Sequence, residues 1–369
     1  MNLYKQTSTL IFLFISTCLM AQYNLNNLQI LCDDQDLDEV EQTPDDFNVS
    51  YTYKNLRLYP IIANDNFIEH HSDIGEFTLL KDAIESKKIR ITETGSADNV
   101  ELESNDQLQE NNQTLENNQT QRIITQNIQS QSNNTYGVSG TVNTLIAENI
   151  SSDTIFIMAG EVVKGGKQDR VIAQDVILSP NEKIDLSAFC VEKNRWATKN
   201  ENKGAFTGYF NVTSMDIRES ITEEKNQSEV WRKVAKHTTI NDARSSTNTY
   251  TNLENSDEYQ KDVEKYMAKF GDAFINNKSV IGFVAVTGNE IIGCDMFATN
   301  DLFINSYQNL IHSYIGHSIT NGSEITISNQ EVFSYLNDIL INEKEQEDVI
   351  EKNGTLYKWK DKKLHITTY

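Results

Sequence analysis

Residues 159–170 read AGEVVKGGKQDR, the densest run of unusual residue choices in the chain. The adjacent glycines Gly165 and Gly166 can turn the backbone sharply and let it approach a ligand closely. The cations that could surround an anion here are Lys164, Lys167 and Arg170, of which the arginine suits two parallel hydrogen bonds to a phosphate or carboxylate. The glycine spacing, with no Ser or Thr after the lysine, excludes a Walker A loop. The alternative is an exposed β-hairpin whose glycines form the turn and whose charges keep it soluble.

Strand patterns surround this run on both sides. Candidate strands lie at 51–62, 89–94, 142–147, 154–159, 170–178 and 189–192. Two hairpins are expected later in the chain, one pairing 279–286 with 290–297 and one pairing 355–359 with 364–369. Strands therefore come first, helices follow, and strand pairs return at the end. This order predicts an α+β fold with an antiparallel or mixed sheet core and several helices concentrated in the C-terminal half.

The helices are predicted from apolar spacing and from capping residues. A short helix is expected within 77–89, and Ser256 is a natural N-cap for a helix whose apolar face runs from Tyr259 to Phe274. Asn300 or Asp301 caps the next helix. A last helix near 330–342 leads into the acidic run 343–351, which is interpreted as a solvated helix end.

Composition restricts the function classes. The 369 residues include 32 Lys and Arg against 54 Asp and Glu, a formal net charge of −22. Phosphate-backbone binding needs clustered cationic charge, so a nucleic-acid partner is excluded. Attachment to an anionic membrane through a polybasic patch is disfavoured for the same reason. The 15 Phe, 15 Tyr and 3 Trp are enough for a substantial packed core.

Residues 1–21 resemble a secretory signal peptide, because Lys5 precedes a short apolar run at 10–15 and Ala21 offers a cleavage point. We therefore expect an exported protein, periplasmic or extracellular. A lipid anchor at Cys18 is disfavoured, since Thr17 stands where a lipobox usually has Gly, Ala or Ser. No later segment reaches the length of a membrane span, so no transmembrane segment is expected after signal removal.

Two polar segments interrupt the pattern of strands and helices. Residues 22–50 are acidic and predict an exposed lead-in. In the segment 98–135, Asn and Gln supply 17 of 38 residues, and the sequence ENNQT occurs at both 110–114 and 116–120. So few apolar side chains cannot offset the entropy of ordering, which predicts a disordered low-complexity insertion. A helical protrusion is the alternative. We expect residues 51–369 to form a single domain interrupted by this insertion.

The cysteines and histidines give no metal signal. Cys190 and Cys294 lie in apolar runs and are expected to be buried free thiols. The six histidines are scattered and no CxxC occurs, so neither a metal nor another cofactor is predicted. His312 and His317 are interpreted as ordinary residues, whereas His365 is a candidate lone general acid or base.

Two further runs carry charged residues in apolar surroundings. Residues 189–196 read FCVEKNRW, where Trp196 could stack on a base or sugar and Arg195 could pair with Glu161 or Asp169. The alternative is an internal Arg–Glu ion pair beside a core tryptophan. In 291–297, IIGCDMF, a buried Asp295 needs an arginine, a group of backbone amides or a ligand as its partner. Capping of the following helix is the alternative there.

These runs together resemble one bacterial family, the ARG and rhodanese-phosphatase-superfamily-associated protein domain. The resemblance covers about 50–97 and 136–369, and rests on GGKQDR at 165–170, CVE at 190–192, RW at 195–196 and GCDMF at 293–297. The family's activity is unknown. Its name implies a link to ADP-ribose or nucleotide metabolism by domain association only.

Three functions remain open from the sequence. The first is binding of a small polar or anionic ligand, such as a nucleotide or sugar, through residues Gly165, Gly166, Lys167, Gln168, Arg170, Arg195 and Trp196. The second is a carboxylate-dependent hydrolase of a glycosidic or ADP-ribose-like bond, with acid and base drawn from Glu161, Asp169, Glu192 and Asp295. The third is a structural cell-envelope protein in which the same side chains form a buried polar network.

Overall fold

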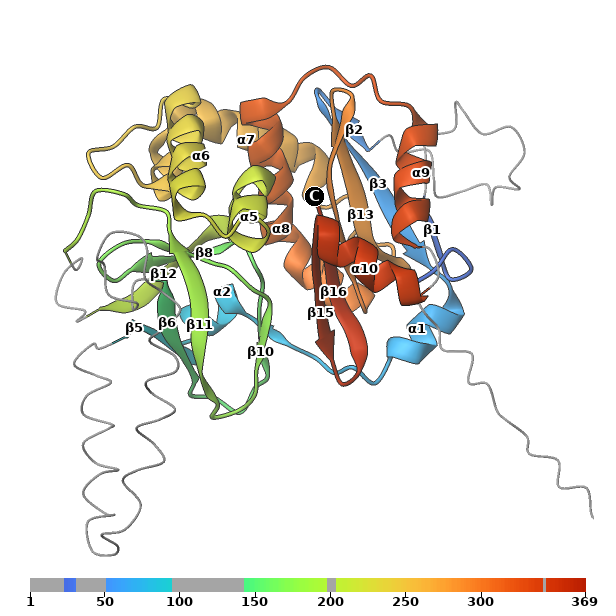
Figure 1. The fold of residues 1–369 in the computed structure, drawn as a ribbon, viewed down its shortest axis with the longest axis horizontal. Coiled ribbons are helices and arrows are strands. Elements are labelled where there is room, and N and C mark those ends of the chain that lie inside the picture. The colour runs from blue at the N-terminus through green and yellow to red at the C-terminus, as the bar shows by residue number, and fades with distance from the viewer. Residues whose placement is uncertain (1–22, 31–50, 95–142, 198–203, 341–342) are drawn as a thin grey trace, which may run out of the picture.

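The computed structural model describes residues 23–30, 51–94, 143–197, 204–340 and 343–369. The predicted signal peptide, most of the lead-in and the Asn/Gln-rich insertion lie outside these ranges. Within them the chain has mixed helices and sheets, so the predicted α+β class is confirmed. A small closed barrel fills one half of the molecule and a larger sheet the other (Figure 1).

The barrel half contains the run at 159–170. Its antiparallel strands, in order around the barrel, are β11 (Lys183–Cys190), β6 (Thr144–Asn149), β5 (Ile89–Glu93), β12 (Ala205–Val212), β8 (Glu161–Gly165) and β9 (Arg170–Ile172). Apolar side chains such as Leu145, Val163 and Leu186 form a core shared with the short helix α2 (Leu80–Glu85). The predicted β8–β9 hairpin is therefore part of a barrel wall, and its Gln168, Asp169 and Arg170 are buried rather than exposed.

A three-stranded sheet beside the barrel corrects one predicted strand. Its members are β10 (Val176–Leu178), β7 (Ile155–Ile157) and β4 (Thr78–Leu79). The segment 170–178, predicted as one strand, is divided between β9 in the barrel and β10 in this sheet. The side chains are apolar on both sides of Gln174 and Asp175, and only the tertiary partners show that the chain changes sheets there.

The second half is built on an antiparallel sheet. Its strands, in spatial order, are β1 (Leu28–Ile30), β3 (Leu56–Ala63), β13 (Val280–Thr287), β14 (Glu290–Phe297), β16 (Lys362–Thr368) and β15 (Gly354–Trp359), with β2 (Thr52–Tyr53) paired to β3. Both predicted hairpins are confirmed as β13–β14 and β15–β16. Tyr23 and Leu28 are buried and β1 pairs with β3, so residues 23–30 belong to the sheet half, although the lead-in was expected to be exposed.

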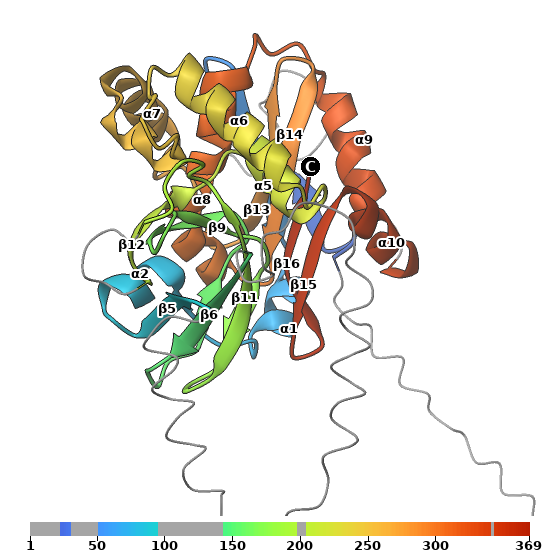
Figure 2. The ribbon, with the colours of Figure 1, turned by 60° about the vertical axis from the view of Figure 1, so that its left-hand side comes forward.

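Helices cover both faces of the sheet (Figure 2). One face packs against α8 (Asn300–Asn321), beside α7 (Asp257–Phe270), and the other against α1 (Asp65–His71), α9 (Asn329–Ile339) and α10 (Glu343–Asn353). This explains why every residue of β13 is buried, with Phe283 and Val284 facing opposite layers.

The helix caps agree in part with the predictions. Ser256 caps α7 as expected, whereas Thr299, rather than Asn300 or Asp301, caps α8. The acidic run 343–351 is not a solvated end of the preceding helix. It forms the separate helix α10, in which Gln346 and Ile350 are fully buried.

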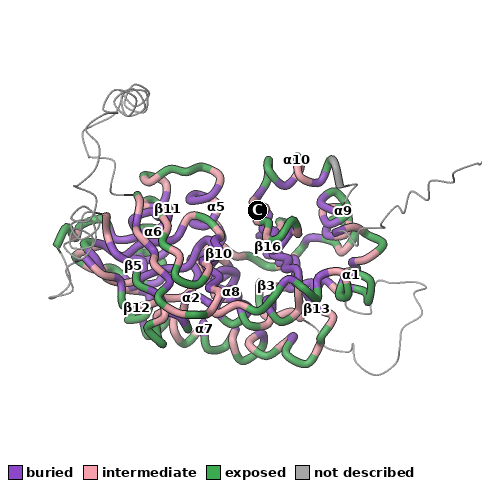
Figure 3. The backbone as a smooth tube through the Cα atoms, turned by 90° about the horizontal axis from the view of Figure 1, so that it is seen from below, coloured by how far each residue is buried: buried purple, intermediate pink, exposed green. Residues whose placement is uncertain are grey.

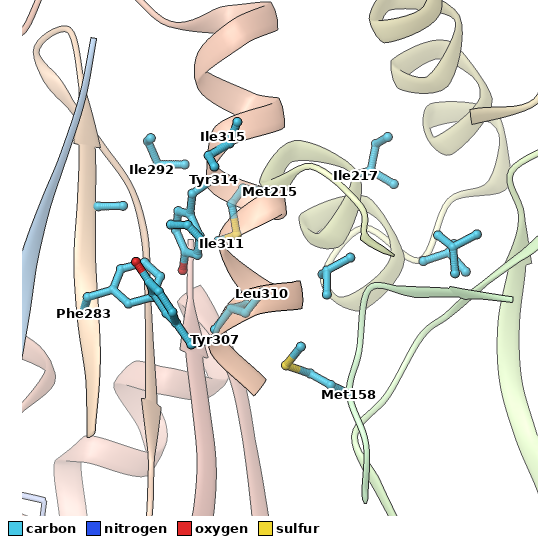
Figure 4. Packing of buried hydrophobic residues seen from close by; sticks show 14 of the residues in the cluster. Met158, Met215, Ile217, Phe283, Ile292, Tyr307, Leu310, Ile311, Tyr314 and Ile315 are labelled. Carbon is cyan, nitrogen blue, oxygen red and sulfur yellow. The ribbon is translucent and has the colours of Figure 1, made fainter. Parts of the chain in front are cut away.

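The barrel and the sheet share one core. In Figure 4, Leu310 and Tyr314 of α8 lie between Phe283 of the sheet and Met158 of the barrel half. The remaining helices of this layer are α5 (Met215–Thr222), α6 (Gln227–Ile240) and the 3-10 helix η1 (Tyr250–Asn255). Buried positions run through both halves (Figure 3). No helix in the described ranges is long and apolar enough to cross a membrane.

Candidate functional site

The turn between β8 and β9 requires both of its glycines. Gly165 and Gly166 have φ values of +145° and +49°. A Cβ on Gly165 would lie 2.5 Å from the carbonyl oxygen of Ala205, and one on Gly166 would lie 2.5 Å from the ring of Phe206. The turn thus lies directly against β12 at the end of the barrel. We call this end, residues 164–169 with 192–197, the rim.

Arg195 holds the two segments of the rim together. Its guanidinium lies 2.6 Å from the Glu192 carboxylate and 3.2 Å from that of Asp169. It also donates to main-chain carbonyls, those of Gly165 (3.1 Å), Gly166 (2.8 Å) and Ala197 (2.8 Å). The predicted pairing of Arg195 with Asp169, and the Arg–Glu pair of the alternative interpretation, are both present. Because the Arg195 guanidinium binds both backbone carbonyls and carboxylates, it fixes the shape of the turn at Gly165 and Gly166.

The carboxylates of the rim are themselves held by donors. Asp169 is fully buried and accepts the hydroxyls of Thr249 (3.2 Å) and Thr251 (2.9 Å). Glu192 accepts the backbone N–H of Asp169 at 3.1 Å. Burial raises the pKa of Glu192, but the hydrogen bonds from Arg195 and from that N–H outweigh burial and leave the pKa below its ordinary value. Thr249 caps η1 and Thr251 lies within it, and no sequence pattern indicated either residue as a partner of Asp169.

The other predicted ligand-binding residues are divided between inward and outward positions. Gln168 is buried and donates to the Glu192 carbonyl at 2.6 Å, and Arg170 is buried and donates to the Gln168 carbonyl at 2.9 Å. Arg170 also lies 3.5 Å from Glu93, which accepts the backbone N–H of Lys167 at 2.7 Å. The Lys167 side chain is 54% exposed, and its ammonium lies 3.8 Å from the Glu93 carboxylate.

Trp196 faces outward as well. It is 56% exposed, so it is not the core tryptophan that the alternative interpretation required. Lys193, three residues earlier, is also exposed, and its ammonium lies 5.4 Å from the ring centre of Trp231. The rim therefore has two parts. Its interior consists of buried side chains that hydrogen-bond to one another, and its outer surface carries Trp196, Lys167 and Lys193.

Two of the four predicted catalytic carboxylates lie elsewhere. Glu161 begins β8, about 13 Å along the strand from the glycine turn. It accepts the backbone N–H of Met158 at 2.7 Å and the hydroxyl of Tyr209 at 2.9 Å. Burial raises the pKa of Glu161 to about 8. The cavity beside it has a volume of about 10 Å³, which admits no more than about one water molecule.

Asp295 lies between the barrel and the sheet, in contact with Arg218 of α5. The two guanidinium nitrogens of Arg218 lie 2.8 and 2.9 Å from the two carboxylate oxygens, and both side chains are fully buried. Tyr314 (2.5 Å) and Thr367 (2.6 Å) donate to the same carboxylate. Burial raises the pKa of Asp295, but Arg218 outweighs burial and holds it well below its ordinary range. The arginine that Asp295 was predicted to meet is thus identified, and Asp295 caps no helix.

His365 extends this cluster. Its Nε2 lies 3.0 Å from Asp295 and its Nδ1 2.6 Å from Asp175, whose other oxygen accepts the backbone N–H of Ala159 at 2.8 Å. Burial lowers the pKa of His365, but the two carboxylates outweigh burial and raise it to about 9. We call Arg218, Asp295, His365 and Asp175 the joint. His365 is therefore not a lone group, and nothing in the sequence indicated Arg218 or Asp175 as its neighbours.

Both described cysteines are buried, and burial raises the pKa of each thiol, as expected for cysteines that act as small apolar residues. In the described part of the chain, no three His, Cys, Asp or Glu side chains gather in a way that could hold a metal ion. The geometry defines an α+β protein with two arginine–carboxylate networks, one at the barrel rim and one at the joint.

The chain belongs to the ARG and rhodanese-phosphatase-superfamily-associated protein domain family, whose model matches residues 46–367. The match includes every residue of the rim and the joint. Comparison with curated proteins and with solved structures finds no match for the chain.

Proposed function

We propose that the chain binds a small polar or anionic ligand, sugar-like or nucleotide-like, on the outer surface of the rim. The observation that carries this proposal is the contrast between neighbouring residues. Arg195 is fixed by two carboxylates and by backbone carbonyls, whereas Trp196 beside it is 56% exposed. A rigid support under an exposed aromatic ring reduces the entropy lost on binding, and tryptophan is a frequent anchor of binding sites.

The charge on the rim surface favours an anionic group in the ligand. Lys167 and Lys193 are exposed there, although the whole chain carries a net charge of −22. The indole would stack on a sugar or base, and an ammonium would meet a carboxylate or phosphate. Because the N-terminal sequence predicts export, we propose anionic glycans of the cell envelope as the first ligands to test, ahead of nucleotides.

The structural alternative is supported by a specific observation, while hydrolysis at Glu161 has little support. At the joint, the side chains of Arg218 and Asp295 are fully buried and form a bidentate ion pair, as expected for residues that hold the two halves together. The cavity of about 10 Å³ beside Glu161 has no room for a glycosidic substrate. We therefore assign the joint to stability and the rim to binding.

The test is a thermal-shift screen of the purified protein against anionic glycans, neutral glycans, nucleotides and ADP-ribose. A ligand at 100 times its Kd adds about 2.7 kcal/mol of stability, a shift of several degrees in Tm. We expect Trp196→Ala to abolish the shift and to leave the melting temperature of the free protein unchanged. Leu25→Ala is the matched control, because Leu25 is 49% exposed beside β1, in the sheet half. A shift that persists in Trp196→Ala, or no shift with any ligand class, would overturn the proposal.

A further inference from the structure

A third polar cluster lies where α5, α6 and α8 meet, outside both the rim and the joint. The Nε2 atom of His237 lies 2.9 Å from the Asp216 carboxylate, and its Nδ1 atom lies 2.9 Å from the hydroxyl oxygen of Thr320. Asp216 comes from the first turn of α5, His237 from the last turn of α6 and Thr320 from the last turn of α8. A carboxylate, an imidazole and a hydroxyl are thus connected by two consecutive hydrogen bonds.

The direction of these hydrogen bonds follows from the donors around them. Ser214 donates to Asp216 at 2.6 Å, and Asn321 lies 3.4 Å from the other oxygen. Burial raises the pKa of Asp216, but His237 outweighs burial and holds it well below its ordinary range. An ionised carboxylate only accepts, so the proton of a neutral His237 must be on Nε2. Its Nδ1 is then an acceptor.

In this neutral form of His237, Thr320 donates its hydroxyl proton to Nδ1. The amide nitrogen of Asn241 lies 2.9 Å from the Thr320 oxygen and occupies one of its lone pairs, which also directs the proton toward Nδ1. His237 is fully buried, whereas Thr320 is partly exposed. A histidine that is oriented by a carboxylate thus contacts the hydroxyl of a partly exposed residue, an arrangement found in activated nucleophiles.

Unsatisfied groups surround the same place. His317 lies near Asp216 and His237 and interacts with both electrostatically. Burial lowers the pKa of His317 to about 4, so its ring is neutral at pH 7. Its Nδ1 atom and the side-chain oxygen of Asn321 are buried without a hydrogen-bond partner in the described ranges. A buried polar atom without a partner needs an explanation, and a catalytic role or a bound water is one.

We propose that Asp216, His237 and Thr320 form a nucleophilic site that cleaves or transfers acyl groups from esters or thioesters. The Thr320 oxygen bonds to the acyl carbon while its proton passes to Nδ1 of His237, and Asp216 stabilises the imidazolium. The bond to the alcohol or thiol then breaks, and the leaving group takes that proton. Water attacks the acyl-threonine, gives a proton to His237 and releases the carboxylic acid, and the proton returns to Thr320. This site is independent of ligand binding at the rim.

The test uses p-nitrophenyl acetate turnover and labelling by a fluorophosphonate, with the modified residue located by mass spectrometry. We expect labelling at Thr320 and a loss of about 100-fold or more in turnover for Thr320→Val and His237→Gln. Thr320→Ser keeps the hydroxyl and should retain turnover, which separates chemistry from misfolding. Thr326→Val, an exposed threonine six residues away, is the matched control and should behave as wild type. Absence of label on Thr320, or equal turnover in Thr320→Val, overturns the proposal.

Discussion

The rim and the joint both set an arginine against carboxylates, yet they bury the charge to different depths and bind different partners. The Arg195 side chain is 11% exposed. Its guanidinium donates hydrogen bonds to the backbone carbonyls of Gly165 and Gly166 as well as to carboxylates. Arg218 is fully buried, and its carboxylate partner Asp295 comes from β14, 77 residues along the chain. The rim network shapes a loop, whereas the joint ties α5 to the sheet.

This difference predicts different consequences when each network is broken. A buried charge that loses its partner keeps the whole cost of desolvation, whereas a partly exposed one is rehydrated. Substitutions at the joint should therefore change global stability. Those at the rim should change local shape and ligand binding more than unfolding.

The largest effect is expected for Arg218→Met, which leaves Asp295 buried without its bidentate partner. The free energy of unfolding should fall by about 3–5 kcal/mol, measured by urea denaturation. Arg232→Met is the control, since Arg232 is 60% exposed and pairs with Glu229 on the surface of α6, and it should cost less than about 0.5 kcal/mol. Equal losses in the two variants would mean that the joint does not hold the halves together.

Gly160→Ala tests the same joint through packing. Gly160 has a φ of +96°, and a Cβ there would lie 2.7 Å from Cγ of Arg218 and 2.9 Å from a methyl of Val212. Strain and crowding together should cost about 2–4 kcal/mol. Gly75→Ala is matched, because its φ is +104° but its nearest neighbour would be 3.8 Å away, so it isolates the backbone strain of about 1 kcal/mol. No difference between the two variants would contradict the close approach of Gly160 to Arg218.

Arg195→Ala should have an intermediate effect. Loss of its bonds to the turn is expected to cost about 1–3 kcal/mol, because Asp169 keeps the two threonine hydroxyls as donors. Arg195→Lys keeps the charge without the planar fork and should recover only part of that loss. Full recovery by lysine would show that the charge, and not the geometry, matters at the rim.

A slope of stability with pH distinguishes the joint from the rim. The pKa of His365 in the folded protein is about 9, above its ordinary value of 6.5, so its stabilisation is complete below about pH 6.5 and is lost as the pH rises through 9. His365→Gln should remove this component, at most about 1.4 kcal/mol per pH unit, from the slope between pH 6.5 and 9.

His71→Gln is the control for that slope. The pKa of His71 is lowered from 6.5 to about 4 by burial, so its influence is confined to the range between those values. Denaturation midpoints for wild type and both variants, taken from pH 6.5 to 9.5, provide the measurement. A slope unchanged in His365→Gln would exclude a charged histidine at the joint.

The sequence predicted the elements whose signals are local. The β15–β16 hairpin, the cap Ser256 and the glycine turn at 165–166 all depend on residues within one or two turns of each other. The run 165–170 also led to the arginine–carboxylate network of the rim. Such local patterns are predictive because the residues that form the turn, cap or hairpin lie close together in the sequence.

What the sequence did not show depends on distant partners. Arg218 lies in an ordinary helix, and Asp175 looks like a break within an apolar run, yet both meet β14 or β16 in the joint. The same holds for His237 and Thr320, which are 83 residues apart. In α10, the buried residues Gln346 and Ile350 stand among acidic residues, so the charge of the segment led to the prediction that it is exposed.

Amide hydrogen exchange with and without a stabilising ligand tests most directly whether the rim binds the ligand while the joint provides stability. Protection is expected in peptides covering 164–167 and 193–197. Trp196→Ala should remove this protection while residues around Arg218 exchange as before. The contradicting result is ligand protection in the open groove of about 770 Å³ between α1 and the start of α8, lined by Phe77, Lys278 and Leu302, with no change at the rim.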